Sequence, residues 1–223
     1  VQSGVISEDR IDEAVLRILK MKVKYGYITN YMSQTLLSQE TFDEHAELNH
    51  QIIEQSLVMA KGNVDFFDYD KSTLVISSIA PRYPLKPGFR INTPENSLAN
   101  IAQTEFAKRG SGTVDYYVAG RTILSSDLVM LLDKTQDFDQ IIVAFENISS
   151  SQANLVNELY NINQDLVAVA LRNPYDIKNY QNVEHYICTF GYYTGTINAL
   201  LDYLAGSFEA SGSLPVYVDV LNN

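Results

Sequence analysis

The residues best suited to chemistry follow apolar runs that are expected to be strands. Glu146 and Asn147 follow one such run, Arg172 and Asn173 follow the next, and Tyr192 follows a third. Ligands of an open parallel sheet bind beyond the carboxyl ends of its strands, so these five side chains are candidates for lining a substrate cleft. Glu146 and Arg172 are the most reactive types among them. The same side chains could equally form a polar rim, cap helices or pair with each other, because position in a fold does not by itself assign a function.

The histidine and aspartate residues lack the spacing of a metal site. His45 and His50 are five positions apart and do not share one face of a helix. Asp65, Asp68 and Asp70 have neither the spacing nor the glycine and terminal glutamate of an EF-hand loop. The sequence therefore predicts surface histidines, a solvated turn and no metal.

Nucleophile and cofactor motifs are also lacking in the sequence. No G-x-S-x-G serine elbow is present. Cys188 and His185 are three apart on an expected strand and would point to opposite faces, so Cys188 is predicted to be a core thiol. The turn at residues 110–113, Gly-Ser-Gly-Thr, precedes a strand, whereas a phosphate-binding turn follows one and opens a helix. We therefore expect no cofactor.

Two kinds of segment alternate along most of the chain and would position these side chains. Short β-branched or aromatic runs indicate strands buried on both faces, at residues 74–76, 114–118, 141–145, 166–171 and 186–190. Amphipathic helical stripes lie between them, near residues 98–106, 123–132, 155–160 and 197–204. The alternation predicts an α/β fold, a three-layer αβα sandwich with a mostly parallel sheet and right-handed crossovers.

The N-terminal region follows a different pattern. Ser7 can cap a helix, whose apolar stripe runs from Ile11 to Tyr25 and which ends before Gly26. A polar loop over residues 29–40 leads to a second expected helix near residues 42–56. We predict a helical linker and lead-in helix over residues 1–56 and an α/β sandwich over residues 57–223. Prolines predict a long surface loop at residues 82–93.

Composition narrows the class of protein. The 223 residues include 46% hydrophobic and 19% charged residues, which is ordinary globular usage. The net charge of −11 argues against a nucleic-acid or anionic-membrane surface, and no apolar run is long enough to cross a bilayer. The single cysteine excludes an internal disulfide and a Cys-based zinc site. The chain begins at Val1 rather than Met, and we expect it to be a piece of a longer protein.

Four stretches resemble one enzyme family. Residues 4–22 read GVISEDRIDEAVLRILKMK and residues 170–176 read ALRNPYD. Residues 212–216 read GSLPV, with Ser213 where the family usually has a basic residue. Residues 55–61, QSLVMAK, are similar to the first strand of the family's second domain. Together these stretches closely resemble bacterial β-N-acetylglucosaminidases of glycoside hydrolase family 3, and the resemblance spans nearly the whole chain.

The resemblance implies a C-terminal domain without its catalytic (β/α)8 barrel. Such enzymes remove terminal β-linked N-acetylglucosamine from cell-wall or chitin-type saccharides with retention, which needs two carboxyl groups about 5 Å apart. In this branch the nucleophilic Asp and the His–Asp acid/base pair belong to the barrel, so no catalytic residue is assigned here and the fragment should be inactive alone. In other branches the second domain lends an acid/base Glu, for which Glu146 is the nominee. The implied partners are the barrel and the carbohydrate substrate.

The motif residues are expected to be structural, and two other classes of function stay open. The residues predicted to have structural roles are Pro174, Tyr175, Asp176, Gly212, Leu214 and Pro215. Pro174 would end a strand, and Asn173 and Asp176 would bond nearby backbone as turn formers. One alternative is a stand-alone carbohydrate- or peptidoglycan-binding module, given 15 tyrosines. The other is a flavodoxin-like ligand binder. The sugar and the compartment stay open, with a secreted or cell-surface location favoured.

Overall fold

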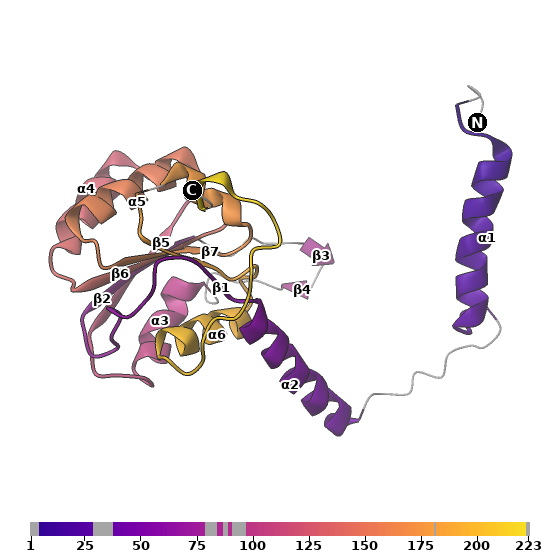
Figure 1. The fold of residues 1–223 in the computed structure, drawn as a ribbon, viewed down its shortest axis with the longest axis horizontal. Helices are drawn as coiled ribbons and strands as arrows, with labels where there is room; N and C mark the ends of the chain where they lie inside the picture. Colours follow the sequence, from indigo (N-terminus) through magenta and orange to yellow (C-terminus); the bar gives the residue numbers. More distant parts are fainter. Residues whose placement is uncertain are drawn as a thin grey trace. The chain divides into compact units, whose positions relative to one another are not determined.

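A computed structural model describes residues 5–28, 38–78, 84–86, 89–90, 97–180 and 182–221 (Figure 1). The chain forms two compact units, Val1–His45 and Ala46–Asn223. The domain boundary predicted at residue 56 stays a prediction. The loop predicted at 29–40 lies mostly outside the described residues. Part of the loop predicted at 82–93 is instead an antiparallel pair of strands, β3 (Pro84–Lys86) and β4 (Phe89–Arg90), and the rest is outside the described residues.

The first helix, α1 (Glu8–Lys24), begins where its capping residue predicts. The Ser7 hydroxyl accepts a hydrogen bond from the Arg10 backbone N–H at 3.2 Å, which satisfies one of the free N–H groups of the first turn. Gly26 follows the helix with a φ of 75°, a left-handed conformation that glycine adopts without strain. None of the residues of α1 is buried within its own unit. The second helix is α2 (Gln39–Ser56).

A six-stranded sheet forms the centre of the α/β unit, in the order β1-β8-β7-β6-β2-β5. Its strands are β1 (Val58–Lys61), β2 (Thr73–Ser78), β5 (Val114–Ala119), β6 (Gln140–Phe145), β7 (Leu166–Ala170) and β8 (His185–Cys188). Only β1, at one edge, is antiparallel to its neighbour. The predicted mostly parallel sheet is therefore confirmed.

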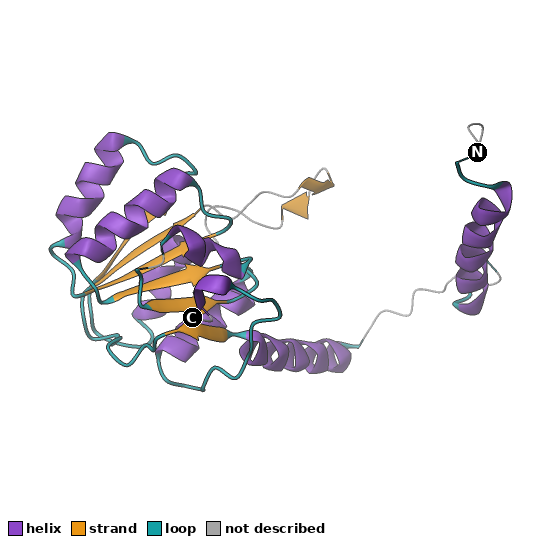
Figure 2. Cartoon of the chain, turned by 45° about the horizontal axis from the view of Figure 1, so that its top comes forward, coloured by secondary structure: helices purple, strands orange, loops and turns teal. Residues whose placement is uncertain are grey.

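Helices cover both faces of this sheet (Figure 1 and Figure 2). One layer holds α4 (Ser125–Thr135) and α5 (Ser150–Ile162), and the other holds α3 (Leu98–Phe106) and α6 (Thr194–Leu204). In β6, Ile141 and Val143 join the core with α4 and α5, whereas Ile142 and Ala144 join the core with α3 and α6. Alternate side chains of a strand point to opposite faces, so every β6 residue is buried and the sequence shows an unbroken apolar run. The predicted three-layer αβα sandwich is confirmed.

The strand order creates one topological switch point. The chain passes from β2 outward to β5 and then returns to β6 on the other side of β2. The parallel strands β6, β7 and β8 then follow in order, so the loops after their carboxyl ends lie next to one another. Open α/β sheets bind ligands beyond the carboxyl ends of their strands, so these loops hold the candidate site.

Candidate functional site

The structure brings together Glu146 and Arg172, which follow β6 and β7. The Leu171 backbone N–H donates to the Phe145 carbonyl at 2.9 Å, so the two strand ends stay adjacent. The Arg172 guanidinium donates to the Glu146 carboxylate at 2.7 Å. The Glu146 side chain is only 10% exposed, whereas that of Arg172 is 50% exposed. The carboxylate is therefore held at the sheet edge by a cation that reaches solvent.

A second pair links the same two loops. The Asn173 side-chain amide donates to the Asn147 side-chain oxygen. Asn147 has a φ of 50°, in the left-handed region that asparagine tolerates better than most residues. The Asn173 side-chain oxygen accepts the Tyr175 backbone N–H at 3.0 Å and caps the 3-10 helix η2 (Pro174–Asn179). Asn173 is thus a turn former, as predicted, and it also fixes Asn147.

Asp176 belongs to η2 and is buried. Burial raises the pKa of its carboxyl group to about 6, and the Ile148 backbone N–H acts on this pKa in the opposite direction. Within the described residues its Oδ2 atom has no hydrogen-bond partner. Asp176 was expected to bond backbone in its own turn, but its carboxylate accepts no hydrogen bond from that turn among the described residues.

Tyr192 follows β8 at the same edge. Its ring stacks on that of Tyr193, with centroids 5.1 Å apart. Tyr192 is partly buried against the core with α3 and α6, whereas Tyr193 is 54% exposed. The exposed ring is therefore that of Tyr193 and not that of Tyr192, which the sequence had predicted. The only sequence signal for Tyr193 was the Tyr-Tyr dipeptide before α6.

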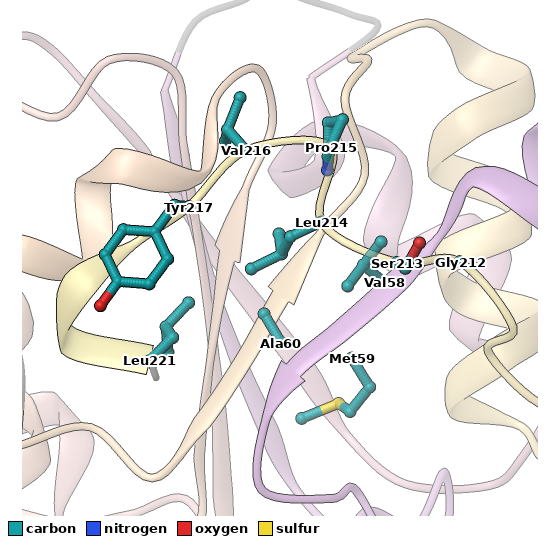
Figure 3. A pocket seen from close by; sticks show the side chains of 10 residues that line it. All are labelled: Val58, Met59, Ala60, Gly212, Ser213, Leu214, Pro215, Val216, Tyr217 and Leu221. Carbon is teal, nitrogen blue, oxygen red and sulfur yellow. The ribbon is translucent and has the colours of Figure 1, made fainter. Parts of the chain in front are cut away.

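A separate pocket of about 630 Å³ lies between β1 and residues 212–217 (Figure 3). The Gly212 backbone N–H donates to the Leu57 carbonyl at 3.1 Å, and a Cβ on Gly212 would lie 2.6 Å from that oxygen. Leu214 packs against the core with α4 and α5, and Pro215 lines the pocket. The lining residues include no carboxylate, histidine or lysine, so this pocket offers no acid–base pair.

The other sequence candidates have structural surroundings. His45 and His50 are exposed on α2, and the His50 side chain lies 3.1 Å from Glu54. Among the described residues, no group of His, Cys, Asp and Glu could hold a metal ion. Cys188 is buried, and burial raises the pKa of its thiol to about 12, while His185 on the other face packs on Phe66.

Comparison with known proteins gives a relationship over almost the whole chain. No family model matches. A β-N-acetylglucosaminidase/β-glucosidase from Cellulomonas fimi is 24% identical over 230 residues, covering 97% of this chain and 40% of that protein. The chain resembles family 3 glycoside hydrolases in its fold. The resemblance predicted from the sequence motifs is confirmed, and the coverage is consistent with a C-terminal domain of such an enzyme.

Solved structures of family 3 enzymes share the fold. A family 3 β-N-acetylglucosaminidase from Paenibacillus sp. str. FPU-7 matches with a TM-score of 0.70 and 23% identity, over 96% of this chain and 40% of that one. A β-glucosidase from Listeria innocua in complex with isofagomine matches with a TM-score of 0.61 and 18% identity, over 93% of this chain and 32% of that one. This chain thus spans about 40% of the length of its first relatives. Within its described residues, no helix is both long and apolar enough to cross a membrane.

Proposed function

We propose that this chain is the C-terminal accessory domain of a family 3 β-N-acetylhexosaminidase that acts on terminal β-linked N-acetylglucosamine. The observation that carries the proposal is the match of 97% of this chain to 40% of a β-N-acetylglucosaminidase/β-glucosidase. The remaining part of such an enzyme would supply the barrel with the nucleophile and the acid/base. This chain would stabilise that barrel and line one wall of its substrate cleft.

The geometry of the sheet edge supports a cleft wall rather than a complete active site. Retaining hydrolysis needs two carboxyl groups that face the scissile bond about 5 Å apart. Glu146 is paired with Arg172, and the neighbouring carboxyl group of Asp176 is only 6% exposed. Asp176 therefore cannot flank a glycosidic bond. Glu146, Arg172 and the Asn147–Asn173 pair offer charged and amide groups that suit hydroxyl and acetamido groups of a sugar.

The apolar stripe of α1 would suit an apolar partner surface. Ile11, Val15 and Ile18 are 42%, 47% and 52% exposed on one face of the helix. A helix in water normally buries such a stripe, because exposed apolar area is costly. The proposed barrel of the same polypeptide would cover it.

The decisive experiment compares this chain with the longer protein encoded at its locus. We expect the sequence upstream of Val1 to encode a barrel, and the longer protein to hydrolyse a chromogenic N-acetylglucosaminide that this chain alone leaves intact. Glu146→Gln in the longer protein should raise KM several-fold with little change in kcat, because a cleft-wall contact is lost. Glu158→Gln, an exposed position on α5, is the control.

Three outcomes would contradict the proposal. Turnover by repurified chain alone that disappears in Glu146→Gln would make this domain catalytic. A fall in kcat of several orders of magnitude in the longer protein, with KM unchanged, would make Glu146 the acid/base rather than a wall residue. If the longer protein preferred a glucoside to the N-acetylglucosaminide, the proposed family would stand and the proposed substrate would be wrong.

A second candidate function, carbohydrate binding without catalysis, is favoured by the exposed ring of Tyr193. Its ring is held by stacking on Tyr192, and aromatic faces with exposed edges suit sugar rings. Calorimetry of this chain with chitooligosaccharides tests it. Binding that is lost in Tyr193→Ala and kept in Tyr217→Ala, a more exposed tyrosine of the C-terminal segment, would support a binding module.

A further inference from the structure

Strand β5 lies at one edge of the six-stranded sheet, and β2 is the only strand that pairs with it in the described part of the chain. The Thr73 backbone N–H donates to the Thr113 carbonyl at 2.8 Å, which fixes the direction of the peptide groups that follow. Backbone groups alternate in direction along a strand, so those of Asp115 point toward β2 and those of Tyr116 point away from the sheet. A further strand at this edge would therefore pair with the backbone of Tyr116.

The Asp115 carboxylate already occupies this position. Its Oδ1 atom accepts the Tyr116 backbone N–H at 2.7 Å, and its Oδ2 atom lies 2.5 Å from the Lys134 Nζ atom. Asp115 is on the same face of β5 as Tyr117, which packs against the core with α4 and α5, and Lys134 is in the last turn of α4. The ion pair with α4 therefore holds the carboxylate beside the edge.

The rest of β5 favours pairing with another strand. Its sequence, VDYYVA, is rich in β-branched and aromatic residues and contains no proline. All but its last residue are at least partly exposed, whereas every residue of the central strand β6 is buried. Natural proteins keep such edges from pairing with other chains by means of charged side chains, prolines or bulges. Asp115 is the charged residue of β5.

The β5 edge of a second copy of this chain is the partner that fits this edge. In a two-fold dimer of antiparallel strands centred on Tyr116, the N–H of each Tyr116 would donate to the C=O of the other. This pairing needs the N–H that Asp115 holds. It would also bring the Asp115 carboxylates of the two copies together as diagonal neighbours on one face of the joined sheet, where like charges repel.

We propose that Asp115 prevents the β5 edge from pairing with the β5 edge of a second copy, because its carboxylate occupies the Tyr116 backbone N–H. The edge is thus an interaction surface that one side chain keeps unpaired. This inference is independent of the proposed function, since every contact in it belongs to the described part of this chain.

Light scattering of the full 223-residue chain over a range of concentrations tests the proposal. Asp115→Ala should raise the association constant for dimer formation about tenfold or more over the wild type, because one N–H in each copy gains a new acceptor. Asp137→Ala removes the same charge at an exposed position after α4 and should associate like the wild type. Equal association of the two variants would overturn the proposal.

Amide hydrogen exchange, followed by nuclear magnetic resonance, identifies the surface that pairs. In dilute Asp115→Ala, the Tyr116 amide should exchange several-fold faster than in the wild type, because it has lost its acceptor. At high concentration, the second copy should protect it again. Association without this concentration-dependent protection would place the contact elsewhere and overturn the proposal.

Two further measurements keep the test decisive if Asp115→Ala folds poorly. Asp115→Val, which also lacks an acceptor and has a higher strand propensity, should associate in the same way as Asp115→Ala. In the dilute wild type, the Tyr116 amide should exchange several-fold more slowly than an amide open to water. A Tyr116 amide without protection in the wild type would show that Asp115 does not hold it, and the proposal would be wrong.

Discussion

The guanidinium of Arg172 lies 2.7 Å from the carboxylate of Glu146, although the two residues are 26 positions apart in the chain. The pair is asymmetric, because the acid is 10% exposed and the base is 50% exposed. Removing the base would leave a nearly buried carboxylate without its cation, whereas removing the acid would leave a cation that solvent can stabilise. Removal of Arg172 should therefore destabilise the fold more than removal of Glu146.

We expect Arg172→Ala to lower the free energy of unfolding by about 1–3 kcal/mol, the cost of a buried charged acceptor that has lost its donor. Lys134→Ala breaks a pair in which the Asp115 side chain is 45% exposed, and it should cost less than about 1 kcal/mol. Urea unfolding of the two variants makes the comparison. Equal effects would show that the burial of Glu146 does not matter.

Gly212→Ala should destabilise the fold because its new Cβ would meet backbone rather than a movable side chain. The nearest atom would be the Leu57 carbonyl oxygen, 2.6 Å away. We expect a loss of roughly 1–3 kcal/mol, as for other overpacked positions. Gly120→Ala is the control, since its Cβ would have no contact closer than 3.6 Å. Denaturant midpoints that are the same for both variants would argue against a close approach at Gly212.

Cys188 should be inert in the folded chain. It is fully buried, and burial raises the pKa of its thiol to about 12, so almost no thiolate forms near pH 8. We expect Ellman's reagent to modify no thiol in native buffer and one thiol per chain after denaturation. Rapid modification of the native chain would mean that β8 opens readily or that the thiol is exposed.

The stability contributed by Asp176 should depend on pH with a definite sign. Its folded-state pKa of about 6 is above its ordinary value of 3.8, so the native state keeps a proton that the unfolded state has lost between those pH values. Stability due to this group is therefore greatest below about pH 4 and falls as the pH rises to 6, by up to about 3 kcal/mol. Unfolding of the wild type and of Asp176→Asn at several pH values isolates this slope as their difference. A difference that is flat from pH 4 to 7 would contradict the shifted pKa.

The secondary structure followed from local patterns in the sequence. The strands β2, β6 and β7 are buried along almost their whole length and contain continuous apolar runs, and the amphipathic stripes of the sequence form α3, α4, α5 and α6. Ser7 and Gly26 delimit α1 because capping depends only on neighbouring backbone. The family resemblance was likewise carried by short, contiguous motifs.

The arrangement of the candidate site depended on tertiary structure. The periodicity of apolar residues predicts which side chains are buried, but it does not predict the order of the strands in the sheet. That order makes β6 and β7 neighbours. Only this neighbourhood brings Glu146 to Arg172 and Asn147 to Asn173. Asp176 was expected to bond backbone in its own turn, whereas its Oδ2 atom is buried without a hydrogen-bond partner among the described residues, and the burial of a single atom leaves no local pattern in the sequence. Sequence thus determined the elements and the family, whereas the packing of the elements decided which polar groups meet.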